Sequence, residues 1–202
     1  QSNRIVDNSS TSASITTSGS PTIQRFSPFN PTSAYSTSVI GGSGYFDGSG
    51  DYLTLPVNSA FDLGTNACCV EAWVYLLNSS TVGLFCTTTG SSGQTRPNFT
   101  VYTTGFAADY FGNVFFSGSV TIPLNSWNHV VFTRATTNGA WRFFLNGVLQ
   151  GYNATGTQNL LQTTVSQTVG YYAGGYSYCY ISDLRITNGS VPTSYQTSST
   201  TT

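Results

Sequence analysis

The segment of residues 127–151, WNHVVFTRATTNGAWRFFLNGVLQG, constrains the fold most strongly, because it predicts two antiparallel strands joined by tight turns. In its first part, β-branched and aromatic residues alternate between two faces with the period of two that a strand requires. Asn138-Gly139 predicts the first turn, because both residues tolerate a positive φ angle. A second strand is expected over Trp141–Leu145, followed by another turn at Asn146-Gly147. This pattern favours an all-β binding module over an enzyme.

The composition indicates a folded chain with an unusually uncharged surface. Hydrophobic residues make up 39% of the 202 residues and aromatic residues 14%, which is enough for a substantial core. Only 6% of the residues are charged, whereas an average soluble protein has about 25%. All six basic residues are Arg and the net charge is −1, so no basic patch is available for a phosphate backbone. We therefore expect a neutral polar surface and no nucleic-acid partner.

The sequence also gives no sign of a membrane or export segment. No apolar run approaches the length of a membrane span, so we expect no membrane contact. The chain contains no Met, and no early segment has the basic-then-apolar pattern of a signal peptide. We therefore expect a processed product or a part of a longer polypeptide.

Further short strands are expected along most of the chain, with turn signals at roughly the eight-to-twelve-residue spacing of a β-sandwich. A strand over residues 68–77 is expected to turn at residues 78–80 and return as a hairpin over residues 82–86. The other strands are expected at residues 44–47, 52–55, 99–103, 109–116, 119–122, 164–170 and 178–187. This arrangement predicts an all-β, antiparallel, two-sheet jelly-roll sandwich.

The predicted sandwich occupies residues 41–192, with a different composition on either side. Residues 1–40 are rich in Ser, Thr and Pro, with short strands expected at residues 5–6, 14–17 and 22–26. They form either a peripheral sheet packed on the sandwich or a connector that leads into it. Residues 193–202 are expected to be a polar tail.

Four cysteines, Cys68, Cys69, Cys86 and Cys179, leave two states open. An even number permits two disulfide bridges outside the cell, with three possible pairings. However, the adjacent Cys68 and Cys69 point to opposite faces of a strand, and the expected hairpin puts Cys86 near Trp73. We therefore favour free buried thiols, which behave as small apolar side chains. The spacing does not match a zinc site.

Four motifs in a fixed order resemble the laminin-G-like, concanavalin-A-like jelly-roll domains. They are YFDGSGDYLTLP (45–56), CVEAWVYL (69–76), WNHVVFTR with WRFFLNG (127–147) and YISDLRITNG (180–189). The resemblance implies two antiparallel sheets packed face to face, often with glycan-binding or protein-binding loops along one rim. Related modules usually carry Lys just after the final strand, where this chain has Asn188.

A longer run upstream, IQRFSPFNPTSAYSTSVIGGSGYFDGSGDYL, resembles the lead-in of such domains in virion proteins of marine tailed phages. There the domain is typically one module of a tail, fibre or capsid-surface protein. This resemblance implies an extracellular location on a virion surface or appendage, in multiple copies. It agrees with the neutral, Ser- and Thr-rich composition.

The carboxylates argue against a glycosidase, which needs two carboxyl groups about 5–9 Å apart. The chain has a single Glu, Glu71, and six Asp, with no suitable pair on one strand. The resemblance implies that the strand of Arg185 neighbours that of Glu71, so we expect a cross-strand ion pair between them.

Calcium is a possible cofactor, because Asp47 and Asp51 flank the turn Gly48-Ser49-Gly50 and offer carboxylate ligands. The resemblance adds Asp183, since related domains often bind calcium near this turn and the end of the chain. The alternative is a turn in which Asp47 and Asp51 accept hydrogen bonds from nearby backbone N–H groups.

The remaining candidates are aromatic. Trp127 and His129 lie in a Trp-x-His pattern that the resemblance identifies as packing, and no catalytic triad surrounds His129. Tyr171, Tyr172 and Tyr176 surround Gly174-Gly175, and Tyr110 belongs to a second aromatic group. An apolar ring with a polar hydroxyl suits sugar stacking. The alternative is that these tyrosines pack the sheets.

We therefore expect a non-enzymatic recognition module of a virion surface or appendage, which binds cell-surface glycans through rim loops. The alternative is a structural decoration or assembly domain that contacts other virion subunits. In the first case aromatic rings are exposed beside Asn or Asp on a rim. In the second they are buried against neighbouring subunits.

Overall fold

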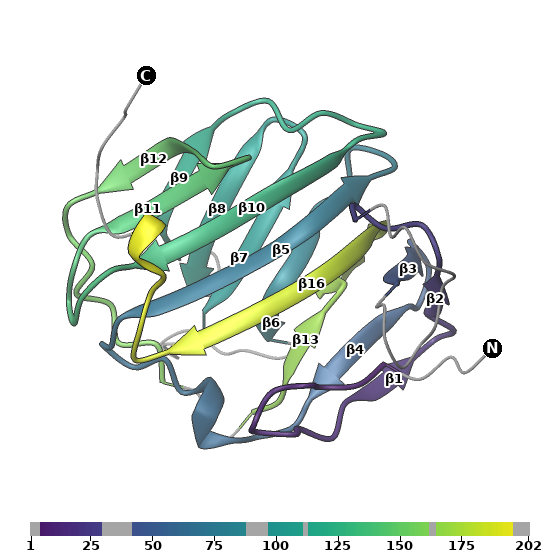
Figure 1. The fold of residues 1–202 in the computed structure, drawn as a ribbon, viewed down its shortest axis with the longest axis horizontal. Helices are drawn as coiled ribbons and strands as arrows, with labels where there is room; N and C mark the ends of the chain where they lie inside the picture. Colours follow the sequence, from purple (N-terminus) through teal and green to yellow (C-terminus); the bar gives the residue numbers. More distant parts are fainter. Residues whose placement is uncertain (1–4, 30–41, 88–96, 111–112, 162–164, 196–202) are drawn as a thin grey trace.

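A computed structural model describes residues 5–29, 42–87, 97–110, 113–161 and 165–195. Within these residues, two seven-stranded antiparallel sheets pack face to face (Figure 1). One, called here the β6 sheet, has the order β1 (Thr16–Ser18), β4 (Tyr52–Leu55), β13 (Gln167–Val169), β6 (Val82–Thr87), β7 (Asn98–Tyr102), β8 (Gly105–Tyr110) and β9 (Asn113–Ser119). The other, called the β5 sheet, has the order β12 (Val148–Asn153), β11 (Trp141–Leu145), β10 (Trp127–Arg134), β5 (Cys68–Leu76), β16 (Tyr178–Asn188), β3 (Ser43–Asp47) and β2 (Thr22–Gln24). The predicted all-β, two-sheet jelly-roll sandwich is confirmed.

Three small elements complete the described part of the chain. A hairpin of β14 (Tyr171–Tyr172) and β15 (Gly175–Tyr176) follows β13. The short 3-10 helices η1 (Ser59–Phe61) and η2 (Thr193–Tyr195) follow β4 and β16. Neither helix is long or apolar enough to cross a membrane.

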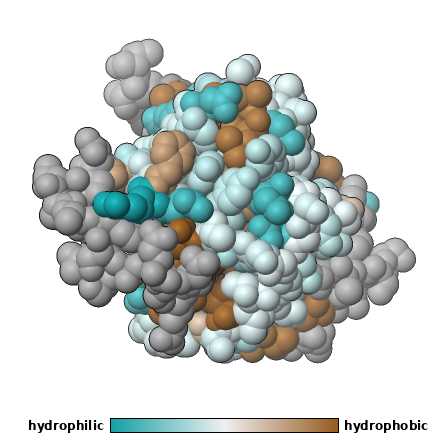
Figure 2. Space-filling view, turned by 90° about the vertical axis from the view of Figure 1, so that its right-hand side faces the viewer, coloured by the Kyte–Doolittle hydropathy of each residue, from teal (hydrophilic) through white to brown (hydrophobic). Residues whose placement is uncertain are grey.

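The core forms because alternate residues of each strand point between the sheets. In β5, Val70, Ala72 and Val74 are almost fully buried on the inner face. Aromatic rings fill the centre, where the rings of Phe106 and Phe143 stack with centroids 3.9 Å apart. By contrast, the described surface facing the viewer in Figure 2 is mostly pale, with few strongly hydrophilic residues and some apolar patches. The low charge of the sequence is therefore visible as a neutral surface.

The expected hairpin between residues 68–77 and 82–86 is wrong. β5 pairs with β10 and β16, whereas β6 belongs to the opposite sheet and pairs with β7 and β13. Both strands carry a buried apolar face, so the chain crosses between the sheets and the two faces pack against each other. Cys86 therefore does not lie beside Trp73 on one sheet.

Several strand limits also differ from the prediction. Residues 109–116 were expected as one strand, but they contain the end of β8 and the start of β9, which pair with each other. Residues 5–6 and 119–122 do not form the strands expected there, apart from Ser119 at the end of β9. The β11–β12 turn at Asn146-Gly147 has both φ angles positive, at 50° and 81°. At Asn138-Gly139 only Asn138 has a positive φ angle, of 52°. Here a longer loop, rather than a two-residue turn, joins β10 to β11.

The N-terminal strands are part of both sheets. β1 pairs with β4 at one edge, and β2 pairs with β3 at the edge of the other sheet. The segment of residues 30–41 lies outside the described residues. The same is true of the tail after Tyr195.

All four cysteines are free and buried. Burial raises the pKa of the Cys68 thiol to about 11, and it raises the pKa of Cys69, Cys86 and Cys179 as well. These thiols are therefore protonated core side chains at neutral pH, as favoured from the sequence.

Arg134 is a buried cation that ties loops to the end of β10. Its guanidinium donates to the carbonyl oxygens of Asn66 and Gly64, at 2.7 Å each, and of Gln158, at 2.5 Å. It also lies 5.0 Å from the centroid of the Trp141 ring. Burial lowers the pKa of the guanidinium. This residue holds together the segment of residues 63–66, which follows η1, and the 154–160 loop, which are also joined by the Gly64–Leu160 bridge.

Candidate functional site

Three tyrosines gather where the β14–β15 hairpin meets the start of β4. The rings of Tyr171 and Tyr176 lie 5.2 Å apart, and Tyr52 lies 5.3 Å from Tyr171 and 6.3 Å from Tyr176. We call these three residues the tyrosine cluster. Tyr176 is the most exposed member, at 37% of its surface, and its strand is joined to β14 through Ala173 and Gly174, both with positive φ. The cluster therefore offers aromatic rings to solvent on a short, tightly turned loop.

Tyr172 has a different task from its neighbours. Its hydroxyl donates to Oδ2 of the buried Asp109 at 2.8 Å. Oδ1 of Asp109 accepts a hydrogen bond from Nδ2 of Asn98 at 2.9 Å, and Asn98 in turn accepts one from the backbone N–H of Thr87. Burial and the Asp109 carboxylate raise the pKa of Tyr172, so its hydroxyl remains a donor. Tyr172 thus anchors the hairpin to the β6 sheet.

Tyr110 does not join the tyrosine cluster. Its ring packs on Phe115, 4.8 Å away, at the margin of the core. Burial raises its pKa to about 12. Of the four tyrosines proposed from the sequence, the structure brings together Tyr171 and Tyr176, adds Tyr52, and gives Tyr172 and Tyr110 supporting positions.

The three proposed calcium ligands do not converge. Asp47 Oδ1 accepts the N–H of Ser49 at 2.7 Å, and the carboxylate of Asp51 accepts the N–H groups of Ser20 and Asp47. Asp183 lies on β16, five residues beyond the partner of Asp47 in the β3–β16 register, which corresponds to roughly 16 Å. Within the described ranges, no three His, Cys, Asp or Glu residues form a group that could hold a metal. The arrangement fits the turn better than it fits calcium.

A second aromatic group, not identified from the sequence, lies on the outer face of the β5 sheet. Trp127, Tyr75, Tyr180 and Tyr45 are register partners on four successive strands, β10, β5, β16 and β3. Phe26 lies on this row, with its ring 4.8 Å from Tyr75, 5.2 Å from Trp127 and 5.1 Å from Tyr180. Alternation assigns each residue to one face of its own strand, but the strand order that aligns these four residues is not readable from local sequence.

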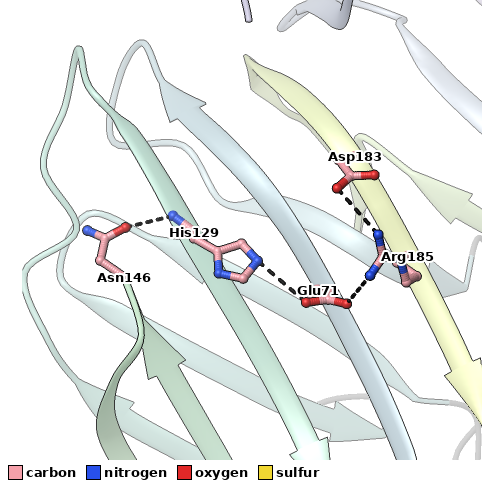
Figure 3. Close-up of polar contacts among 5 residues, drawn as sticks. All are labelled: Glu71, His129, Asn146, Asp183 and Arg185. Atoms are coloured by element: carbon pink, nitrogen blue, oxygen red, sulfur yellow. Dashed lines mark hydrogen bonds and ion pairs between the residues drawn. The ribbon is translucent and has the colours of Figure 1, made fainter. Parts of the chain in front are cut away.

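On the same strands, next to the row of Trp127, Tyr75 and Tyr180 in the register, lies a chain of polar contacts. Figure 3 shows its residues. Glu71 lies at its centre, with Oε2 3.5 Å from Nε2 of His129 and Oε1 3.2 Å from Nη1 of Arg185, as Figure 3 shows. Arg185 also contacts Asp183 at 3.6 Å, and Asn146 accepts the backbone N–H of His129 at 2.8 Å. Hydrogen bonding from His129, together with the charge of Arg185, lowers the pKa of Glu71 despite its burial.

The polar chain includes the cross-strand Glu71–Arg185 pair expected from the sequence, and it extends the pair to His129. The imidazole also packs on Trp73, with ring centroids 5.0 Å apart. Trp127 packs in the aromatic row. Glu71, Arg185 and His129 therefore neutralise one another's charge or polarity, and His129 and Trp127 also pack against aromatic rings.

Known families and structures match the same fold. The model of the family Laminin_G_3, described as the concanavalin A-like lectin/glucanases superfamily, matches residues 47–193. A search of curated proteins gave no match. Among solved structures, the binding domain of botulinum neurotoxin DC in complex with SialylT is 12% identical with a TM-score of 0.66. The binding domain of Paraclostridial Mosquitocidal Protein 1 is 9% identical with a TM-score of 0.68.

The neurotoxin alignment covers 95% of this chain and 47% of the neurotoxin chain, and the mosquitocidal alignment covers 96% and 48%. The chain thus spans about half the length of these binding domains, and at such low identity the likeness concerns the fold alone. The family match covers most of the chain, from the β3–β4 turn to η2. The chain belongs to the concanavalin A-like lectin/glucanases superfamily.

Proposed function

We propose that this chain is a non-enzymatic recognition module that binds glycans through the tyrosine cluster. The observation that carries the proposal is the close grouping of the Tyr52, Tyr171 and Tyr176 rings where β4 meets the β14–β15 hairpin, with Tyr176 exposed. Tyrosine rings provide an apolar face for a sugar ring and a hydroxyl for its polar groups. The anchoring of the hairpin by Tyr172 keeps this surface ordered before a ligand arrives.

The family and the structural neighbours support this choice. One botulinum structure is described as a complex with SialylT, and cell entry of botulinum neurotoxin type C is described as dependent upon interaction with two ganglioside molecules. A third neighbour is described in complex with rat synaptotagmin II, so this fold also serves protein recognition. The resemblance of the upstream run to phage virion proteins supports a place on a virion surface or appendage. A shallow aromatic site of this kind gains strength from repeated copies.

The test is a glycan array probed with the multimerised chain and with variants of the cluster. Tyr176→Ala and Tyr171→Ala should each reduce binding about tenfold, the effect expected when an aromatic contact of about 1–1.5 kcal/mol is removed. Tyr152→Ala is the matched control, because Tyr152 is an exposed tyrosine outside the cluster, on the edge strand β12, and is more accessible than Tyr176, at 54% against 37%. Binding should be the same in calcium and in chelator, since the carboxylates do not fit a calcium site.

Absence of binding to any glycan, or equal loss in the Tyr152 control, would count against the recognition function. The alternative is then a structural module that contacts other virion subunits. That alternative is favoured by Phe26 and Phe29, which are 43% and 49% exposed on the outer face of the β5 sheet.

A further inference from the structure

The outer face of the β5 sheet carries apolar rings that remain partly exposed within the described part of the chain. Phe26 rests on Tyr75, Trp127 and Tyr180, yet 43% of its own surface remains accessible. Phe29 lies edge-on to Trp73 at 5.8 Å and is 49% exposed. We call Phe26, Phe29, Trp73, Tyr75, Trp127 and Tyr180 the aromatic face. Neighbouring exposed apolar groups of this kind are typical of contact surfaces.

The composition of the aromatic face is that of a protein interface. Interface centres are enriched in Trp, Tyr, Phe and Arg and depleted of other charged residues. The aromatic face contains Trp, Tyr and Phe. Arg185 lies beside it on β16, the strand of Tyr180, where it pairs with Glu71 while Tyr180 pairs with Tyr75. The carboxylate of Glu71, on β5, is buried and bound to Arg185 and His129. The face therefore presents rings without an excess of like charge.

The exposed charges next to the face are self-complementary. The side chains of Arg185 and Asp183 are 58% and 52% exposed and lie 3.6 Å apart. In a two-fold contact between identical faces, Asp183 of one copy can meet Arg185 of the other, and the reverse contact forms at the same time. The net charge of −1 also leaves little general repulsion between copies. A second copy of this chain is thus the partner whose chemistry matches this surface.

We propose that the aromatic face, with Asp183 and Arg185 at its margin, is the contact between two copies of this chain. The contact buries Phe26 and Phe29 of both copies and exchanges the Asp183–Arg185 pairs across a two-fold axis. This inference goes beyond the proposed glycan binding and does not depend on it. If both hold, the dimer presents two tyrosine clusters and raises the strength of a shallow site by avidity.

The test is sedimentation velocity of the full chain from about 1 to 200 μM, the range in which a transient dimer of micromolar affinity becomes populated. The wild type should reach twice its mass of 21.5 kDa. Phe26→Ser with Phe29→Ser should weaken dimerisation at least tenfold, because it removes the exposed rings. Val148→Ser with Tyr152→Ser is the matched control, since these β12 side chains are 57% and 54% exposed elsewhere and should leave the dimer unchanged.

A second variant separates loss of contact from loss of folding. Asp183→Asn removes only the charge, and Asn also tolerates the positive φ of 49° at this position. It should weaken the dimer several-fold and abolish its sensitivity to salt, with an unchanged circular dichroism spectrum. A wild type that stays monomeric throughout the range would overturn the proposal. A dimer that is disrupted only by the β12 variant would also overturn it. The same holds for a dimer that is weakened neither by the Phe26/Phe29 variant nor by Asp183→Asn.

Discussion

At the scale of single residues, the buried Glu71 connects the stability of the fold to pH. Its folded pKa lies below the ordinary value of 4.5, first because of the hydrogen bond from His129 and then because of Arg185. A carboxyl group with a depressed folded pKa stabilises the fold above its unfolded pKa and loses that contribution as pH falls through the folded pKa. The stabilisation by Glu71 is therefore present at neutral pH and is lost below about pH 4.5.

Glu71→Gln should therefore lower the free energy of unfolding by about 1.5–3 kcal/mol at pH 7, the scale of a hydrogen bond to a charged group. The difference from wild type should shrink as the pH is lowered from 7 toward 3, because the wild-type carboxyl becomes protonated as the pH falls through its lowered pKa. Urea unfolding at both pH values measures this. Asp183→Asn, at an exposed ion pair, should cost no more than about 0.5 kcal/mol. An equal cost of Glu71→Gln at both pH values would contradict the electrostatic explanation.

At the scale of elements, the β14–β15 hairpin depends on one side chain that reaches the β6 sheet. Tyr172→Phe keeps the ring and removes the hydroxyl that donates to Asp109. Loss of one hydrogen bond to a charged acceptor weakens the local structure by about 1.5–3 kcal/mol. Amide exchange over residues 171–176 should accelerate about tenfold or more, and glycan binding should weaken in parallel, while strands such as β5 remain protected. Unchanged exchange in this hairpin would show that Tyr172 is not its anchor. Tyr152→Phe is the control.

At the scale of the whole molecule, the N-terminal strands decide how much of the chain forms the folding unit. β1 and β2 each add an edge to one sheet, and Ile5 and Ile15 pack against the core. Deletion of residues 1–24 should therefore lower the free energy of unfolding by about 2–4 kcal/mol, the value of one or two buried aliphatic side chains. Deletion of residues 196–202 is the control and should have little effect. If both deletions leave the thermal midpoint unchanged, residues 1–24 are only a connector.

The sequence by itself determined the fold class and most of the strands. Alternation with a period of two identified β5, β10 and β11 within one residue, because each strand has one face against a dry core. It also identified the Asn146-Gly147 turn, since few residues adopt two successive positive φ angles. Free buried cysteines were expected because the adjacent Cys68 and Cys69 point to opposite faces of one strand, and they are confirmed, although the hairpin that placed Cys86 near Trp73 was wrong.

Only the tertiary structure decided which strands are neighbours, because alternation fixes the faces of a strand but not its partner. For that reason the β5–β6 hairpin was wrong, and the row of Trp127, Tyr75, Tyr180 and Tyr45 was not foreseen. The same limit applied to the tyrosines. Tyr171, Tyr172 and Tyr176 were grouped by sequence distance, but Tyr52 enters the cluster and Tyr172 turns to Asp109 through contacts between distant segments. The candidate tyrosines could be recognised from the sequence by their residue type. Their roles depend on which distant segments the packing of the two sheets brings next to them.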